Sequence, residues 1–341
     1  MKKFRLIALL LIFALIATMV IGCSGSTSNE GESEGEGEGE GEGEAKDEVF
    51  ISIATGGTAG AYYPIGGAMA SVITNTLDYV NATAESTGAS IDNANLIQDS
   101  ESDLALLQND TAYYAATATV LDAFKTEYDN LLGMAVLYPE TIQIVATASS
   151  GIKTVEDLVG KKVAIGAPGS GTEANANQIL AAYGLTYDDL GKADYLSFAE
   201  AGEQLQNGQI DAAFVTAALP NAAITEVAQV TDIVIVEIES EYVKKLTEDY
   251  PFYVEITIPA GTYKGQEEDV ASTAVMAMLA VRGDLEEDVV YDITKAIFEG
   301  LDTIAKSHDM AKQITLEKAL DGMPLEMHPG AKKYFDEKGI K

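Results

Sequence analysis

The sequence from residue 49 to the C-terminus predicts an α/β fold with two similar lobes. Short apolar runs alternate with helical patterns, and strands that alternate with helices favour open, largely parallel sheets. The chain has 341 residues, which is more than one hydrophobic core usually serves. Two sets of elements also begin alike, each with a strand, a loop rich in Gly, Ser and Thr, and a helix.

The elements of the first set are expected in order along residues 49–148. VFISIA at 49–54 alternates like a strand, and a helix is expected over 64–77. SDLALLQND is expected to be a short buried strand that opens a loop, and LLGMAVLYPETIQIVATA contains two strand-like runs. One face of the expected helix carries Ile65, Met69, Val72, Ile73 and Thr76.

The second set starts at TVEDLVGKKVAIGAPGSGTEANANQILAAYGL, which predicts a short helix, a strand, a glycine loop and a helix. It continues through ADYLSFAEAGEQLQNGQIDAAFVTAALPNAAI as strand, helix, strand and loop. In open sheets of this kind, ligands bind beyond the carboxyl ends of the strands, where these loops are expected.

Residues 1–48 are predicted to stay outside the fold. MKKFRL and the apolar stretch after it are typical of an export signal, although the stretch is almost long enough for a retained membrane anchor. VIGC resembles a bacterial lipobox, so we interpret 1–23 as a lipoprotein signal peptide and Cys23, the only cysteine, as the lipidated residue. Residues 24–48, rich in Gly, Ser and Glu, predict a disordered acidic tether.

Composition and motifs exclude several functions. The net charge of −33 excludes a nucleic-acid partner, because phosphate backbones require a basic surface. His308 and His328 are the only histidines, no residues have metal-ligand spacing, and no nucleophile motif is present. GAPGSGTE is not a phosphate loop, since Thr172 and Glu173 stand where that motif has Lys and a hydroxyl. We therefore expect a protein that is not an enzyme and has neither metal nor cofactor.

Four loops at strand-to-helix junctions are candidates for a ligand site: TGGTAGAYYP, ESTGASIDN, GAPGSGTEAN and VTAALPNAA. Free N–H groups and the positive end of a helix dipole attract an anion, and the loops carry several hydroxyl groups. A single such loop is explained equally well by helix caps and tight turns. Four similar loops, two from each lobe, favour a shared site. Arg282 is the only arginine outside the leader, so a bound anion would rely mainly on backbone N–H groups, hydroxyls, tyrosines or a lysine.

Several motifs together resemble a known family. ISIATGGTAGAYYPIGGAMA, ESTGASIDN, DLALLQND, LYPE, DLVGKKVAIGAPGSGTEANA, IPAGTYKGQ and PLEMHPGAKKYFDEKG are similar to segments of the TAXI-type solute receptors of TRAP transporters. The resemblance runs from about residue 51 to the C-terminus. It implies a two-lobed periplasmic-binding-protein fold of type II, a Venus flytrap with hinge strands. It also implies a ligand in the cleft, a dicarboxylate or an acidic amino acid such as glutamate.

The same resemblance implies which residues bind the ligand. The first lobe would contribute Thr55, Gly56, Gly57, Thr58, Gly60, Tyr62, Tyr63, Thr87, Ala89 and Ser90. The second lobe would contribute Gly169, Ser170, Gly171, Thr172, Ala217, Leu219 and Pro220. Either tyrosine of the adjacent pair could instead pack under its loop. Three positions depart from the family pattern: Ala59 and Ala89 replace a common Gly, and Asp92 replaces a Glu.

The expected domain organisation follows from the hinge strands near TIQIVAT and TAVMAML. Lobe 1 would comprise 49–144 and 273–341, and lobe 2 would comprise 145–272. The expected protein is an extracytoplasmic lipoprotein, held at a membrane through Cys23, that delivers its anion to the membrane subunits of a TRAP permease driven by an ion gradient. A receptor for an ABC importer or a sensor kinase stays open as an alternative. So does a periplasmic enzyme that uses Glu173 or Glu200 as a base.

Overall fold

The computed structural model describes residues 47–341. The predicted leader at 1–23, its Cys23 and the tether up to residue 46 lie outside the described residues. Within residues 47–341, no helix has the combination of length and apolar character that crossing a bilayer requires.

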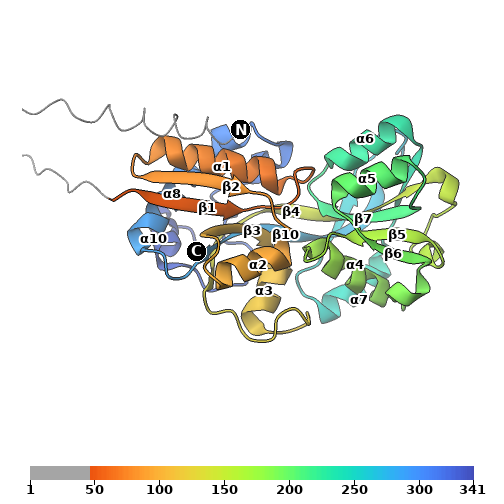
Figure 1. The fold of residues 1–341 in the computed structure, drawn as a ribbon, viewed down its shortest axis with the longest axis horizontal. Helices are drawn as coiled ribbons and strands as arrows, with labels where there is room; N and C mark the ends of the chain where they lie inside the picture. The colour runs from red at the N-terminus through yellow and green to blue at the C-terminus, as the bar shows by residue number, and fades with distance from the viewer. Residues whose placement is uncertain (1–46) are drawn as a thin grey trace, which may run out of the picture. The chain divides into compact units, whose positions relative to one another are not determined.

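Ten strands of the described chain form one sheet, covered by helices (Figure 1). The strands are Val49–Ala54 (β1), Val80–Glu85 (β2), Leu104–Gln108 (β3), Leu131–Thr147 (β4), Lys162–Gly166 (β5), Lys192–Tyr195 (β6), Ala212–Ala217 (β7), Ile233–Val236 (β8), Val254–Ile258 (β9) and Val270–Arg282 (β10). The α-helices are Tyr62–Thr76 (α1), Ser90–Gln98 (α2), Asn109–Thr117 (α3), Gly171–Ala182 (α4), Phe198–Gln206 (α5), Ala222–Val230 (α6), Ser240–Asp249 (α7), Glu287–Glu299 (α8), Leu301–Ile304 (α9) and Pro329–Lys338 (α10).

The sheet is mixed, whereas the sequence pattern predicts largely parallel sheets. Its order is β2-β1-β3-β10-β4-β7-β5-β6, with β8 beside β4 and β9 beside β10. Pairs at both ends are parallel, such as β1 with β2 and β5 with β6. Pairs in the centre are antiparallel, because β4 and β10 run in opposite directions through the middle of the sheet. The two strand-like runs expected between residues 131 and 148 are one continuous strand, β4.

Strands β4 and β10 connect two lobes (Figure 1). We define the first lobe as β1–β3 with α1–α3 and α8–α10, and the second lobe as β5–β8 with α4–α7. The predicted lobe boundaries at 144/145 and 272/273 fall inside β4 and β10. These boundaries and the hinges near them stay predictions.

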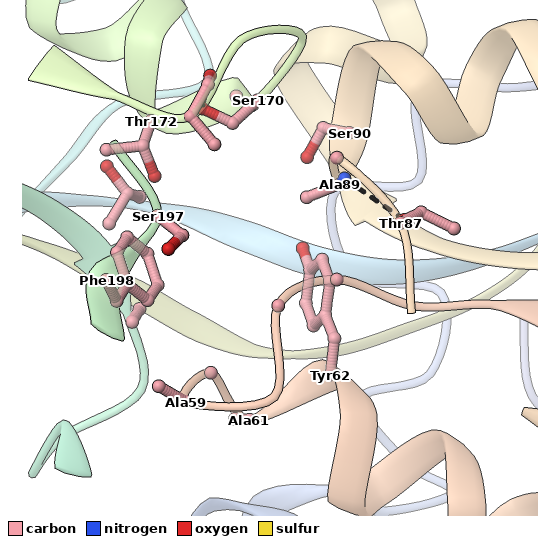
Figure 2. Close-up of a pocket in the computed structure, with 18 of the residues that line it drawn as sticks. Ala59, Ala61, Tyr62, Thr87, Ala89, Ser90, Ser170, Thr172, Ser197 and Phe198 are labelled. Carbon is pink, nitrogen blue, oxygen red and sulfur yellow. Dashed lines mark hydrogen bonds between the residues drawn. The ribbon is translucent and has the colours of Figure 1, made fainter. Parts of the chain in front are cut away.

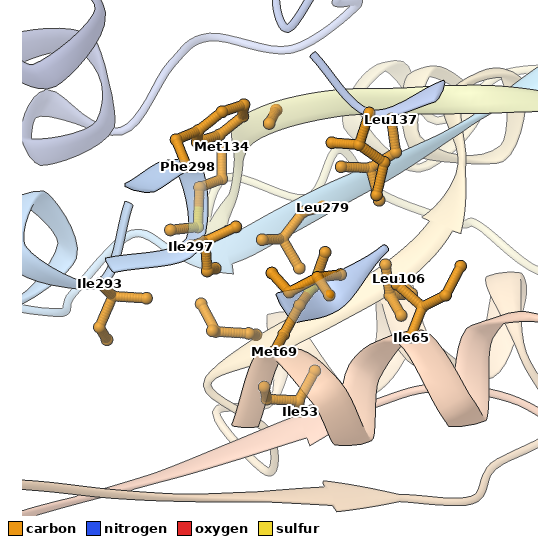
Figure 3. Packing of buried hydrophobic residues seen from close by; sticks show 14 of the residues in the cluster. Ile53, Ile65, Met69, Leu106, Met134, Leu137, Leu279, Ile293, Ile297 and Phe298 are labelled. Atoms are coloured by element: carbon orange, nitrogen blue, oxygen red, sulfur yellow. The ribbon is translucent and has the colours of Figure 1, made fainter. Parts of the chain in front are cut away.

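The core of the first lobe forms between α1, α8 and the sheet. Ile65 and Met69 point from α1 toward the strands, where they lie with Leu106 and Leu279 in one buried cluster (Figure 3). Each such side chain stabilises the fold by about 1.5–3 kcal/mol when fully buried. Thr76, expected on the same face, is exposed, because it is the last residue of the helix.

The second lobe has a separate core. Ile179 and Leu180 of α4 pack with Val163 and Ile165 of β5 and with Phe214 of β7. On the other face of these strands, α5 and α6 bury a second cluster. Each lobe is therefore stabilised by its own apolar contacts.

One expected loop is a helix. The segment after LALLQ continues directly into α3, in which Ala112, Tyr114 and Ala115 are buried. The Asp110 carboxylate accepts a hydrogen bond from the Thr111 N–H across 2.7 Å and so satisfies a donor of the first turn. The buried face of this short helix depends on tertiary packing, which the local pattern does not reveal.

Candidate functional site

A cavity of about 340 Å³ lies between the lobes, at the carboxyl ends of the strands. Small-molecule pockets are commonly about 300–1,000 Å³, so this one suits a small ligand. From the first lobe and the connecting strand β4, it is lined by Gly56, Gly57, Thr58, Ala59, Gly60, Ala61, Tyr62, Ser86, Thr87, Gly88, Ala89, Ser90, Gln108 and Glu140. From the second lobe it is lined by Ala167, Ser170, Gly171, Thr172, Ser197, Phe198, Ala199, Thr216 and Ala217.

The structure brings most of the predicted site residues to this pocket. They are Gly56, Gly57, Thr58, Gly60, Tyr62, Thr87, Ala89, Ser90, Ser170, Gly171, Thr172 and Ala217. Figure 2 shows Ser170 and Thr172 of the second lobe facing Tyr62 and Ser90 of the first. Whether they contact a ligand stays a prediction.

Five predicted residues do not line the pocket: Thr55, Tyr63, Gly169, Leu219 and Pro220. Thr55 is buried, and its hydroxyl donates to the Glu85 carbonyl across 2.6 Å, which joins the ends of β1 and β2. Tyr63 is exposed to solvent. Of the adjacent tyrosines, Tyr62 is the one that lines the pocket.

The prediction missed Gln108 and Glu140 and the segment Ser197–Ala199. Gln108 ends β3 and Glu140 lies within β4, so neither stands in a glycine loop. A local signal did exist for Ser197, because SFAE is a capping-box pattern that marks a helix start. The remaining unpredicted lining residues are Ala59, Ala61, Ser86, Gly88, Ala167 and Thr216.

Four helices begin at the pocket. The capping residue and the first residue of each line the cavity: Ala61 and Tyr62 for α1, Ala89 and Ser90 for α2, Ser170 and Gly171 for α4, and Ser197 and Phe198 for α5 (Figure 2). The first N–H groups of a helix have no intrahelical acceptor, and its N-terminus carries partial positive charge. The pocket is therefore electrostatically suited to an anion.

In α4 and α5, the capping side chain accepts a hydrogen bond only from the N–H group of the third helical residue. The Ser170 hydroxyl accepts from the Glu173 N–H across 3.2 Å, and the Ser197 hydroxyl accepts from the Glu200 N–H across 3.4 Å. The N–H groups of Gly171, Thr172, Phe198 and Ala199 have no acceptor among the described residues. These groups are free to bind a ligand in the cavity.

The N-terminus of α2 is used differently. The Gly169 carbonyl, from the second lobe, accepts hydrogen bonds from the N–H groups of Ile91 and Asp92 across 3.0 and 3.1 Å. Gly169 thus joins the lobes beside the pocket instead of lining it. Ala89, which caps the helix, has a φ of 78° and a ψ of −140°, a conformation that favours glycine. This strain gives a physical reason for the glycine common at that position of the resembling family.

The lobes approach each other closely at Gly171. A Cβ atom built there would lie 1.9 Å from Gln108 Oε1 and 2.9 Å from Ser90 Oγ, both in the first lobe. A side chain at this position would require the Gln108 side chain to shift or α4 to move. Two polar atoms in the pocket wall, Gln108 Oε1 and Thr216 Oγ1, are buried without a hydrogen-bond partner among the described residues.

Glu140 is a buried carboxyl group in the pocket wall, with 4% of its surface exposed. The Tyr62 hydroxyl donates to Glu140 Oε2 across 2.7 Å. Burial raises the pKa of Glu140 to about 8. The hydrogen bond from Tyr62 lowers this pKa, whereas the charge of the nearby Asp110 raises it. Burial and the Glu140 charge likewise raise the pKa of Tyr62 well above its usual value.

The lining residues, all in the described part of the chain, include no Lys, Arg or His. Arg282 lies elsewhere, with its Nε bonded to Asp103 Oδ1 across 2.8 Å. Residues 47–341 contain no cluster of His, Cys, Asp and Glu that could hold a metal ion.

The two candidate general bases, Glu173 and Glu200, are also outside the pocket lining. The Glu173 carboxylate accepts from Tyr187, and the Glu200 carboxylate accepts from Ser197. Hydrogen bonds from Ser197 lower the pKa of Glu200, which makes it a weaker base. The enzyme alternative thereby loses the residues that motivated it.

A model of the NMT1-like family matches residues 53–339. The chain belongs to the NMT1-like family. Because the match covers nearly all of the described residues, both lobes of this NMT1-like protein are part of the family's architecture.

Solved structures similar to this NMT1-like protein show its fold. The periplasmic binding protein BugD is 13% identical, over 86% of this chain and 96% of that chain, with a TM-score of 0.54. MatC from Rhodopseudomonas palustris with bound malate is 13% identical, over 85% and 97%, with a TM-score of 0.52. PhnD1 from Prochlorococcus marinus in complex with methylphosphonate is 12% identical, over 85% and 97%, with a TM-score of 0.52. The NMT1-like chain therefore has the two-lobed fold of periplasmic binding proteins.

Proposed function

We propose that this protein is an extracytoplasmic solute-binding protein that captures a small organic anion between its lobes. The convergence of four helix N-termini on one cavity between the lobes carries this proposal. Free N–H groups of α4 and α5 would bind the anion's oxygens, and the helix dipoles would stabilise its charge. We propose binding without a covalent step. Among the described residues, no group of His, Cys, Asp and Glu could hold a catalytic metal ion.

We infer that the ligand is a dicarboxylate or an acidic amino acid such as glutamate. The cavity of about 340 Å³ is near the lower limit of ligand pockets, which favours a molecule of a few carbon atoms. The bound malate of MatC, which shares this fold, supports the same class. Carboxylate groups accept several hydrogen bonds each, which suits the free N–H groups of Gly171, Thr172, Phe198 and Ala199.

The membrane partner that we propose is a TRAP-type permease driven by an ion gradient. The motifs that resemble TAXI-type receptors support this choice, above all TGGTAGAYYP and GAPGSGTEANA. An ABC importer is the second candidate, because receptors of both transporter classes share the fold. Lipidation at Cys23 and the tether would keep the protein near either partner. Crosslinking of the full chain in native membranes, followed by identification of the attached membrane subunit, distinguishes the two.

Capture would proceed by closure of the lobes. We place the hinges in β4 near residue 145 and in β10 near residue 273, where the chain crosses between lobes. A ligand that contacts α1 and α4 together binds the closed form better than the open form, so it shifts the population toward closure.

A thermal-shift screen of the full chain against dicarboxylates and acidic amino acids, in low and high sodium, tests the proposal. A ligand at a hundredfold excess over its Kd stabilises the native state by about 2.7 kcal/mol. Thr172→Val keeps the shape of a buried pocket residue but removes its hydroxyl, so it should reduce the stabilisation. Thr76→Val, on the exposed end of α1, is the matched control and should leave it unchanged. No response to any acid, with a response to sugars, would contradict an anion site.

A further inference from the structure

The pocket contains one carboxyl side chain, that of Glu140, among all the described residues that line it. This location conflicts with the electrostatics of the rest of the cavity. The helix N-termini favour a negative ligand, whereas an ionised Glu140, whose side chain is buried in the pocket wall, would repel it. The conflict disappears if Glu140 holds a proton.

The groups around Glu140 provide no compensating positive charge. Tyr62 of α1 donates to it, and Gln108 of β3 lies beside it as a neutral amide. The other titratable groups that face this region are Tyr138, on β4 itself, and Asp110 of α3. On β10, the residue opposite Glu140 is the apolar Val275. Beside it on β4, Thr141 pairs with Ala217 of β7, which is also uncharged.

The hydrogen bond from Tyr62 leaves the other carboxyl oxygen of Glu140 available to hold the proton. It occupies Glu140 Oε2 across 2.7 Å, and a carboxylic acid has one O–H donor besides its acceptor capacity. A neutral Glu140 therefore adds a donor to a pocket wall that also contains the free N–H groups of α4 and α5. An ionised Glu140 could only accept.

We propose that Glu140 is the specificity-determining residue of the pocket and that it holds a proton whenever the anion is bound. This inference rests on the proposed function. The protein thus binds each anion together with one proton, and it excludes the same anion when Glu140 is ionised. Burial supports this assignment, since it raises the pKa of Glu140 to about 8 in the ligand-free protein.

The proton makes the affinity dependent on pH in one direction. Below pH 8 the binding-competent, protonated form predominates, and the affinity is independent of Glu140 titration. Above pH 8 the competent fraction falls by about tenfold per pH unit, and the apparent Kd rises by the same factor. The anion itself should raise the pKa of Glu140 further, because it disfavours a second negative charge.

The test uses calorimetric titration of the full chain with two named probes, succinate and L-glutamate, from pH 6.5 to 9.5. Titrations in two buffers of different ionisation enthalpy give the number of protons taken up. We expect the Kd to rise about tenfold between pH 8.5 and 9.5, with nearly one proton taken up per anion at pH 9. Glu140→Gln should bind with similar affinity at all of these pH values and take up no proton. Asp157→Asn, which removes an exposed carboxyl group outside the pocket lining, is the matched control and should keep the pH dependence.

A second variant and a ligand-free measurement cover a failure of Glu140→Gln to fold. Tyr62→Phe removes a hydrogen bond that lowers the pKa of Glu140, so the pH at which affinity begins to fall should move upward. Infrared spectra of the ligand-free chain should contain a protonated carboxyl band that disappears above pH 8 and is absent from Glu140→Gln.

The outcomes separate the two proposals. Equal affinity at pH 6.5 and 9.5 in the unchanged protein would overturn the role of Glu140 and leave anion capture standing. If L-glutamate, but not succinate, bound more tightly as the pH rose, an ionised Glu140 would be binding the ammonium group. This result would also overturn the proposed role of Glu140. No binding of either acid would contradict the proposed function itself. Absence of the infrared band at pH 7, from the ligand-free chain and from the chain saturated with succinate, would overturn the proton on Glu140.

Discussion

Asn175 Nδ2 donates a hydrogen bond to Asp110 Oδ2 across 3.0 Å, and this bond joins the two lobes. The same amide nitrogen donates to the Tyr253 hydroxyl across 2.9 Å. Asp110 lies in the first turn of α3, and Asn175 lies on α4, one turn beyond the residues that line the pocket. Both side chains are buried, so opening the lobes here would bring water to a carboxyl group that the closed form keeps dry. In the proposed closure of the lobes, this contact would couple the movement to the protonation of Asp110.

The free energy of unfolding should fall as the pH rises from 4 to 6, through Asp110. Burial raises its pKa from 3.8 to about 6, so in this window the unfolded chain ionises the group while the folded chain keeps its proton. The expected slope is about 1.4 kcal/mol per pH unit, and Asp110→Asn should abolish this contribution. Urea unfolding at each pH measures it.

Asp157→Asn is the control of opposite sign. Hydrogen bonds from the backbone N–H groups of Lys153 and Thr154 lower the pKa of this exposed carboxyl group. Its contribution to stability is present above the usual pKa of an Asp and is lost on acidification. The variant should thus be less stable than the unchanged protein at pH 6 and equal to it at low pH. If the free energy of unfolding of Asp110→Asn fell as steeply between pH 4 and 6 as that of the unchanged protein, the prediction that Asp110 keeps its proton in the folded chain would be wrong.

Gly171→Ala should prevent closure. The added Cβ would lie 1.9 Å from Gln108 Oε1, so either the Gln108 side chain must shift or α4 must move away from the first lobe, and we expect the latter because Gln108 is buried. We expect a larger radius of gyration by small-angle X-ray scattering and loss of the thermal stabilisation by ligand. Gly67→Ala is the matched control, because nothing lies within 4 Å of its added Cβ on the exposed side of α1. This control should gain about 0.5–1 kcal/mol of stability. Unimpaired ligand binding by Gly171→Ala would show that close approach at this residue is not required.

Ala89→Gly should stabilise the protein by about 1 kcal/mol. A non-glycine residue at a φ of 78° and a ψ of −140° is strained by about 1–3 kcal/mol, and glycine removes this strain. Glycine also loses more conformational entropy on folding, which offsets about 0.5–1 kcal/mol of the gain. Chemical unfolding at pH 7 measures the change. Ala61→Gly, at the N-cap of α1 with an ordinary φ of −76°, is the comparison and should not stabilise. Equal effects of the two substitutions would contradict strain at Ala89.

The glycine loops and helix starts could be predicted from the sequence, because their signals are local. The Gly-rich segment after β1 and GAPGSGTE before α4 both line the pocket, as the pattern of strand, loop and helix indicates. Ser170 caps its helix as its residue type suggests. Such positions are set by the dihedral angles and hydrogen bonds of a few consecutive residues.

The features that the sequence did not reveal depend on contacts between distant segments. Glu140 is one acid in an apolar run, and it is buried because β4 pairs with β10 and β7 and because α1 places Tyr62 beside it. Thr55 looks like a ligand-binding hydroxyl, yet the neighbouring β2 supplies its hydrogen-bond acceptor. Likewise, the antiparallel course of β4 and β10 is a property of the assembled sheet. Local patterns contain no information on such partners.

Arg282→Gln should destabilise the protein and leave anion affinity unchanged. The guanidinium donates to Asp103 across 2.8 Å and to Asp284 across 3.0 Å, and both side chains of the first pair are mostly shielded from solvent. Loss of such charged hydrogen bonds typically costs about 1.5–3 kcal/mol. Arg282 does not line the pocket, so the Kd for succinate by calorimetry should change less than about twofold, well under the tenfold that 1.4 kcal/mol represents. A tenfold loss of affinity would mean that this guanidinium, rather than the helix N-termini, holds the anion.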